Sequence, residues 1–147
     1  MLFRSPSVLL TAGNHGDEYE GQLALMKLCQ ALEPDMVRGR IIMLPSANYP
    51  AAIAGLRTSP IDDLNLNRSF PGDPDGRPTE AIAHYIESEL LTISDYAVDL
   101  HSGGSSLMYL PSALAQRATD SELAARQEAM LKAFAAPLSY FAIAGVE

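Results

Sequence analysis

The sequence contains little cysteine and few basic residues, and both shortages limit what the chain can be. Its single cysteine, Cys29, excludes an internal disulfide, and its helical spacing from Leu25 predicts a thiol buried in the core. Ten lysines and arginines face 18 aspartates and glutamates, so the net charge is −8 at pH 7. Such a chain repels nucleic acids and anionic membranes, and a small molecule is therefore the expected partner.

Long hydrophobic runs are also absent. The apolar run at residues 8–10 is too short for a signal peptide, and no segment approaches the roughly 20 apolar residues of a membrane span. Together with the single cysteine, this predicts a soluble cytoplasmic protein. A length of 147 residues predicts one domain with a sizeable core.

Strand and helix patterns alternate along the chain. Short apolar runs predict strands at residues 7–12, 41–44, 96–100, 107–110 and 138–143. Helical spacing of apolar residues predicts helices at 17–32, 78–91 and 121–135, with a short helix near 50–55. This alternation predicts an α/β sheet with helices on its faces.

Two histidines follow predicted strands and sit among glycines. His15 and Glu18 form an H-x-x-E pair between Gly13 and the start of a helix, and His101 directly follows the strand at 96–100. The pair alone is a weak signal, but the carboxyl ends of neighbouring strands are where α/β sheets place their ligands. Two imidazoles and one carboxylate form a catalytic zinc set that leaves a fourth position open.

The irregular stretch at 46–77 carries a second group of polar side chains. Arg57, Asn65, Asn67 and Arg68 lie on one loop, where they are able to bind a carboxylate and polarise a carbonyl. The alternative is that the arginines are solvated and the asparagines form turns. A stretch of this length inside a domain is usually functional or disordered, and its order has to come from a ligand or from packing.

Three further residues carry alternatives. Glu80 and His84 are four apart on a predicted helix, and a surface pair is the commoner meaning of that spacing than a ligand pair. Asp99 lies two positions before His101, and its side chain either points to the opposite side of the strand or orients His101 as a hydrogen-bond partner.

Three segments together resemble the succinylglutamate desuccinylase/aspartoacylase family, whose members are zinc amidohydrolases related to the metallocarboxypeptidases. They are GNHGDE at 13–18, NLNRSFPG at 65–72 and DLHSG at 99–103, in the family's order and approximate spacing. Within the family, the motifs are most similar to those of N-acetyl-diaminobutyrate deacetylases. The resemblance implies a three-layer α/β/α fold with a mostly parallel mixed sheet, as in zinc carboxypeptidases.

The resemblance also implies roles for individual residues. One zinc ion per chain would be held by His15, Glu18 and His101, and the activity would be hydrolysis of the amide of an N-acyl amino acid. Asn67 and Arg68 would hold the substrate, with Arg57 as a second anion contact. Arg68 would either stabilise the developing oxyanion or bind the substrate carboxylate. Some relatives carry aspartate where this chain has Asn65, which leaves the role of that position open.

The family's general base is a glutamate in a Thr-Glu-Leu-Gly-like strand, and residues 1–147 contain no such motif. We therefore expect residues 1–147 to be the amino-terminal part of a catalytic domain, truncated at the carboxyl end, with the base outside this chain. Apolar surface left uncovered would favour a homo-oligomer. Two alternatives stay open, namely a zinc carboxypeptidase and a non-catalytic module that binds zinc or a ligand.

Overall fold

The computed structural model describes residues 5–142, which form two compact units. The first unit ends at Leu107 and the second begins at Met108. No helix within residues 5–142 is both long enough and apolar enough to cross a membrane.

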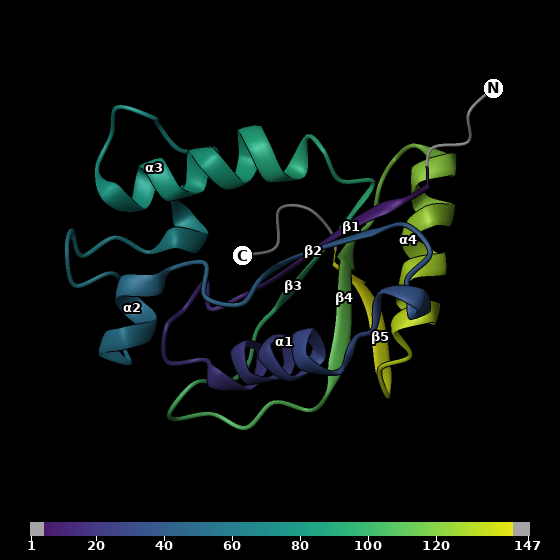
Figure 1. Cartoon of the computed structure of the whole chain (residues 1–147), viewed down its shortest axis with the longest axis horizontal. Coiled ribbons are helices and arrows are strands. Elements are labelled where there is room, and N and C mark those ends of the chain that lie inside the picture. The colour runs from purple at the N-terminus through teal and green to yellow at the C-terminus, as the bar shows by residue number, and fades with distance from the viewer. Residues whose placement is uncertain (1–4, 143–147) are drawn as a thin grey trace. The chain divides into compact units, whose positions relative to one another are not determined.

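The sheet of the first unit has three parallel strands in the order β2-β1-β3 (Figure 1). They are β1 (Ser7–Ala12), β2 (Arg40–Leu44) and β3 (Tyr96–Leu100), and all three confirm the predicted strands. Central β1 pairs with β2 on one side and with β3 on the other, where Thr11 lies opposite Asp99. An apolar sequence suits β1, because a central parallel strand is covered on both faces.

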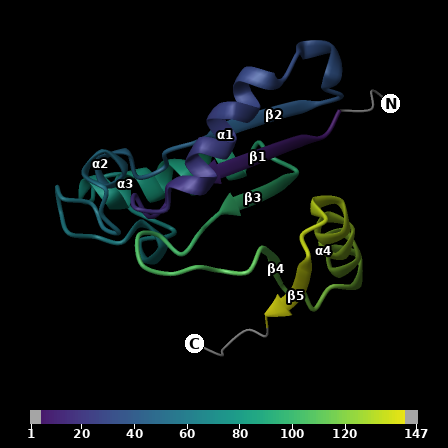
Figure 2. The ribbon, with the colours of Figure 1, turned by 90° about the horizontal axis from the view of Figure 1, so that it is seen from below.

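Helices cover both faces of this sheet. On one face lies α1 (Tyr19–Ala31), as Figure 2 shows. Its Gly21 packs so closely on Ala12 that an added Cβ would lie 3.2 Å from the Ala12 Cβ. On the other, Thr11 lines a cavity together with Ile86, at the junction of α3 (Pro78–Tyr85) and its π-helical continuation η3 (Ile86–Leu91). Successive side chains of a strand alternate between faces, so the first unit has the predicted three layers.

The stretch at 46–77 is ordered by packing. It contains the short helix α2 (Tyr49–Ala54) and the 3-10 turn η2 (Leu66–Arg68). Leu66 is fully buried and packs in one hydrophobic cluster with Ala83 of α3 and Ile86 of η3. The side chain of Asp62 ties the stretch to α3, because its two oxygens accept hydrogen bonds of 2.8 Å each from the backbone N–H and the hydroxyl of Thr79. A further 3-10 turn, η1 (Pro34–Met36), follows α1.

The second unit is a βαβ unit. Strands β4 (Ser112–Gln116) and β5 (Leu138–Ala142) pair in parallel, and α4 (Ser121–Phe134) connects them. Asp120 caps α4 by accepting a hydrogen bond of 2.8 Å from the Leu123 N–H. The helix predicted at 121–135 is confirmed by α4. The strand predicted at 138–143 is confirmed as far as Ala142, and residue 143 lies outside the described residues.

The strand predicted at 107–110 is wrong. Those four side chains are exposed, and the strand begins only at Ser112, after Pro111. An apolar run marks a strand only where a partner strand is available, and here the ladder with β5 starts at the pair Ser112–Leu138. The pairing register of β4 with β5 cannot be deduced from the apolar run at 107–110.

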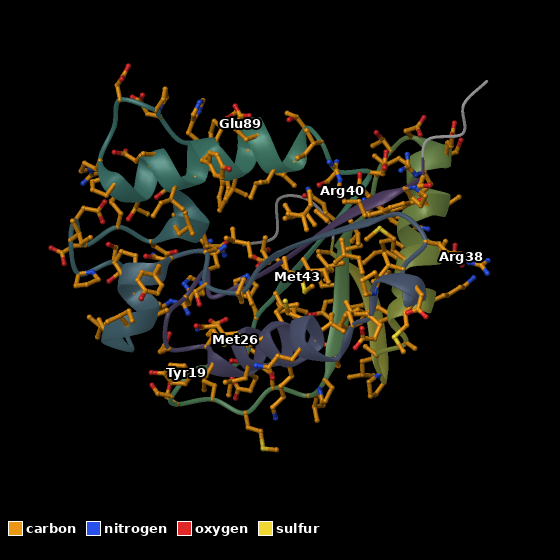
Figure 3. The ribbon with its side chains drawn as sticks, viewed as in Figure 1. Tyr19, Met26, Arg38, Arg40, Met43 and Glu89 are labelled. Atoms are coloured by element: carbon orange, nitrogen blue, oxygen red, sulfur yellow. The ribbon has the colours of Figure 1, made fainter. Side chains whose placement is uncertain are left out.

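The prediction that the Cys29 thiol is buried in the core is also wrong, because Cys29 is exposed. In α1 the buried residues are Gly21, Gln22 and Leu25, and the helix is exposed beyond them. Tyr19 and Met26, labelled in Figure 3, are exposed apolar side chains of the same helix. Periodicity predicts which residues share a face with Leu25, but not how far along the helix that face is covered.

Candidate metal centre

The carboxyl ends of β1 and β3 bring three predicted residues together. His15 follows β1, Glu18 lies just before α1, and His101 follows β3. The loop that carries His15 passes directly over α2, since a Cβ on Gly16 would lie 2.0 Å from the carbonyl carbon of Ala51. Only glycine fits at that position, and the close approach holds His15 over the end of the sheet.

The three side chains form a compact donor cluster. Each offers one ligand atom, and these atoms all lie within 4.8 Å of one another. His15 and Glu18 are 2% and 4% exposed, and the ring centroids of His15 and His101 are 5.3 Å apart. Two imidazoles and a buried carboxylate at this spacing match the donor chemistry of a catalytic transition-metal site.

Glu18 is surrounded by donors. Its Oε2 accepts a hydrogen bond of 2.9 Å from the Ser102 N–H and lies 2.9 Å from Nδ1 of His101. Its Oε1 accepts a bond of 3.3 Å from the Arg57 guanidinium. A buried carboxylate is costly unless it is paired, and these three contacts supply that pairing.

His101 is held through both ring nitrogens. Its Nε2 lies 2.8 Å from Oδ2 of Asp99, and that hydrogen bond is the largest cause of the raised pKa of His101. Burial acts in the opposite direction, while the charges of Asp99 and Glu18 add to the increase. Burial alone would raise the pKa of Asp99, but hydrogen bonds, the first of them from His101, hold it below its usual value.

His15 has the opposite electrostatic surroundings. Its Nδ1 lies 3.3 Å from the carbonyl oxygen of Arg57. Burial is the main cause of the lowered pKa of His15, and the charge of Arg57 adds to it. The neutral imidazole is therefore favoured, which is the form that binds a metal ion.

The polar loop lies beside this cluster. Asn67 lines a cavity of about 330 Å³ together with Asn14 and Asp99, whereas Arg68 is exposed and donates to the carbonyl of Asn67. Asn65 accepts a hydrogen bond of 3.0 Å from the Asn67 N–H, as in the alternative in which the asparagines form turns. Arg57, which was expected near the substrate, is bound to Glu18 as described above.

Comparison with known families agrees with the motifs. Residues 4–145 match the succinylglutamate desuccinylase/aspartoacylase catalytic domain. The chain belongs to this family.

Several members of the desuccinylase/aspartoacylase family are similar to it over nearly all of its length. It is 53% identical over 132 residues, 90% of this chain, to the N-alpha-acetyl-L-2,4-diaminobutyric acid deacetylase of Halomonas elongata, and covers 39% of that protein. The product-bound ectoine utilization protein EutE (DoeB) of Ruegeria pomeroyi superposes with a TM-score of 0.90 at 50% identity, covering 97% of this chain and 44% of that one.

A succinylglutamate desuccinylase/aspartoacylase of Rhodobacter sphaeroides gives a TM-score of 0.89 at 44% identity, covering 94% of this chain and 42% of that one. The chain therefore spans about two fifths of the length of these relatives. Their shared α/β architecture agrees with the fold that the motifs implied.

Sequence reasoning missed several contacts in this family member. Thr11 and Asn14 both donate to Asp99, and the pairing of Thr11 with Asp99 follows only from the register of β1 and β3. Glu80 is bound to the backbone and side chain of Arg77 at the start of α3, a role that its spacing from His84 did not suggest.

Proposed function

We propose that residues 1–147 supply the metal-binding part of a zinc-dependent deacylase that hydrolyses the amide bond of an N-acyl amino acid. The cluster of His15, Glu18 and His101, in which His15 and Glu18 are buried, is the observation that carries this proposal. The deacetylase of Halomonas elongata and the product-bound ectoine utilization protein support N-acetyl-diaminobutyrate as the leading substrate. The general base is proposed to lie outside these residues.

One zinc ion per chain is proposed on the three donors. When bound there, zinc would act as a Lewis acid toward the amide carbonyl and lower the pKa of water toward 7. The protein's own residues prepare this site. Ser102 and Arg57 hold the Glu18 side chain in place, and burial lowers the pKa of His15 and so favours the neutral imidazole that binds a metal ion.

Substrate binding is proposed for Asn67 and Arg68, with Arg57 as a second anion contact. An N-acyl amino acid carries a carboxylate, which a chain with a net charge of −8 would repel unless cations stand near the site. Arg57 and Arg68 are both exposed and provide such cations on one loop. The guanidinium fork of Arg68 suits bidentate binding of that carboxylate, or stabilisation of the developing oxyanion.

Metal content and a panel of substrates test the proposal. Elemental analysis of the purified protein is expected to find about one zinc per chain, lost in both His15→Ala and His101→Ala. His84→Ala changes the third histidine of the sequence, which lies outside the cluster, and serves as the matched control. Absence of zinc after reconstitution of the unmodified protein would contradict the metal centre.

The panel holds N-acetyl-diaminobutyrate, N-acetyl-aspartate, N-succinyl-glutamate and a dipeptide with a free carboxyl terminus. Release of acetate from N-acetyl-diaminobutyrate is the expected result. Cleavage of the dipeptide alone would favour the carboxypeptidase alternative. Binding of zinc and an acyl amino acid without turnover of any of the four would favour the non-catalytic module.

A further inference from the structure

Asp99 joins the metal cluster to the sheet. Its Oδ1 accepts a hydrogen bond of 2.7 Å from the Thr11 hydroxyl. Its Oδ2 accepts one of 3.2 Å from the Asn14 amide and one of 2.8 Å from Nε2 of His101. The carboxylate is therefore fixed by β1 and by the turn that follows it, while the side chain of Asp99 itself belongs to β3.

The arrangement determines which nitrogen His101 offers to a metal ion. An ionised carboxylate only accepts hydrogen bonds, so Nε2 of His101 carries the hydrogen that Asp99 receives. The other nitrogen, Nδ1, then faces Oε2 of Glu18 at 2.9 Å. A ring nitrogen binds a metal ion only after it has lost its hydrogen. With Nε2 bonded to Asp99, Nδ1 is the nitrogen on the side of the cluster and the one that would give up its hydrogen to bind zinc.

We propose that Asp99 is a positioning residue that sets the ring orientation and the donor nitrogen of His101, and that Thr11 and Asn14 hold Asp99 for this task. The proposal rests on the proposed metal centre, and Asp99 itself is not a ligand in it. Residues of this kind typically change metal affinity or activity by about 10–100-fold when they are replaced.

The sheet provides a matched control at its opposite end. Asp95 directly precedes β3, and its Oδ2 accepts hydrogen bonds of 2.7 Å and 2.9 Å from the backbone N–H and the hydroxyl of Ser7 in β1. Like Asp99, it is a carboxylate that accepts hydrogen bonds from β1, but it lies at the amino ends of the strands, away from the three donors. Loss of either carboxylate weakens the sheet, whereas only loss of Asp99 reaches His101.

The test measures zinc affinity by competition with a chromogenic chelator in the purified protein, for Asp99→Ala, Asp99→Asn and Asp95→Asn. We expect Asp99→Ala to raise the zinc dissociation constant by about 10–100-fold. We expect Asp99→Asn to recover part of that loss, because its amide oxygen still accepts a hydrogen bond. We expect Asp95→Asn to bind zinc as the unmodified protein does. The visible spectrum of the cobalt-substituted protein should change only in the Asp99 variants.

Two results would overturn the proposal. One is an unchanged zinc affinity and cobalt spectrum in Asp99→Ala, and the other is an equal loss of affinity in Asp95→Asn. If the unmodified protein binds zinc and His101→Ala does not, either result removes only the role of Asp99. If the unmodified protein binds no zinc, the metal centre itself is wrong.

Discussion

Charge and shape are separate requirements at Arg68. The side chain is exposed and, among residues 5–142, donates only to the carbonyl of its neighbour Asn67, so its guanidinium fork is available to a ligand. Arg68→Lys keeps the charge and removes the fork. We expect kcat/KM for N-acetyl-diaminobutyrate to fall by at least about tenfold, because a lysine binds a carboxylate as a point charge. Steady-state kinetics on zinc-loaded protein measure this.

Arg77→Lys is the matched control, since Arg77 is also exposed but bonds to Glu80 at the start of α3. Its kinetics should not change. The zinc content of Arg68→Lys should equal that of the unmodified protein, because Arg68 makes no contact with the three donors in any hydrogen bond or ion pair among residues 5–142. A variant Arg68→Lys with unaltered kcat/KM would contradict the assigned role.

At the scale of elements, Asp62 connects the polar loop to helix α3. The carboxylate accepts the N–H of Thr79, one of the backbone donors that the first turn of a helix leaves without a partner. Asp62→Ala should therefore lower the free energy of unfolding by about 1–2 kcal/mol, as the loss of a helix cap does. Urea unfolding measures the loss. Thr79→Val removes only the hydroxyl contact, so it should cost less and its effect should not add to that of Asp62→Ala.

The same carboxylate gives a pH dependence of known sign. Burial alone would raise the pKa of Asp62, but hydrogen bonds from Thr79, Leu64 and Ser59 hold it below its ordinary value. A carboxyl whose pKa is lower in the folded state stabilises the fold above its unfolded pKa, and this contribution is lost as the pH falls through the folded pKa. The difference in urea midpoint between the unmodified protein and Asp62→Asn should be largest near neutral pH and shrink toward pH 3. A difference that grows in acid would contradict this assignment.

Elements were predictable where a local pattern decides them. The bounds of β1 and β3 follow from apolar runs that end in glycine or histidine, and α4 begins directly after its capping aspartate, Asp120. The strand at Ser112 was not predictable, because its position depends on the register with β5. The exposure of Cys29 depends likewise on what covers the end of α1, which the sequence of that helix does not contain.

At the scale of the whole molecule, the candidate site is a consequence of topology. Glu18 and His101 are 83 positions apart, yet their side chains meet because parallel strands β1 and β3 end at the same edge of the sheet. That meeting was predictable from two strand patterns and a polar residue after each. The contacts that support it were not, since the bond from Thr11 to Asp99 requires a register and that from Arg57 to Glu18 requires the path of a long loop.

The distance along the chain between the donors leads to a prediction about stability. The unfolded chain cannot hold His15, Glu18 and His101 together, so a metal ion that needs all three binds the folded state and stabilises it. At free zinc 100 times above the dissociation constant, the gain is about 2.7 kcal/mol. We expect zinc to raise the Tm of the purified protein by several degrees, and a chelator to reverse the shift in scanning calorimetry. Mg²⁺ should have little effect, because it prefers oxygen ligands.

His101→Ala should abolish the zinc-induced shift in Tm, since only a carboxylate and one imidazole are left in the cluster. An equal zinc-induced shift in His101→Ala would mean that zinc binds elsewhere on this acidic chain, and that the convergence of β1 and β3 does not create the site.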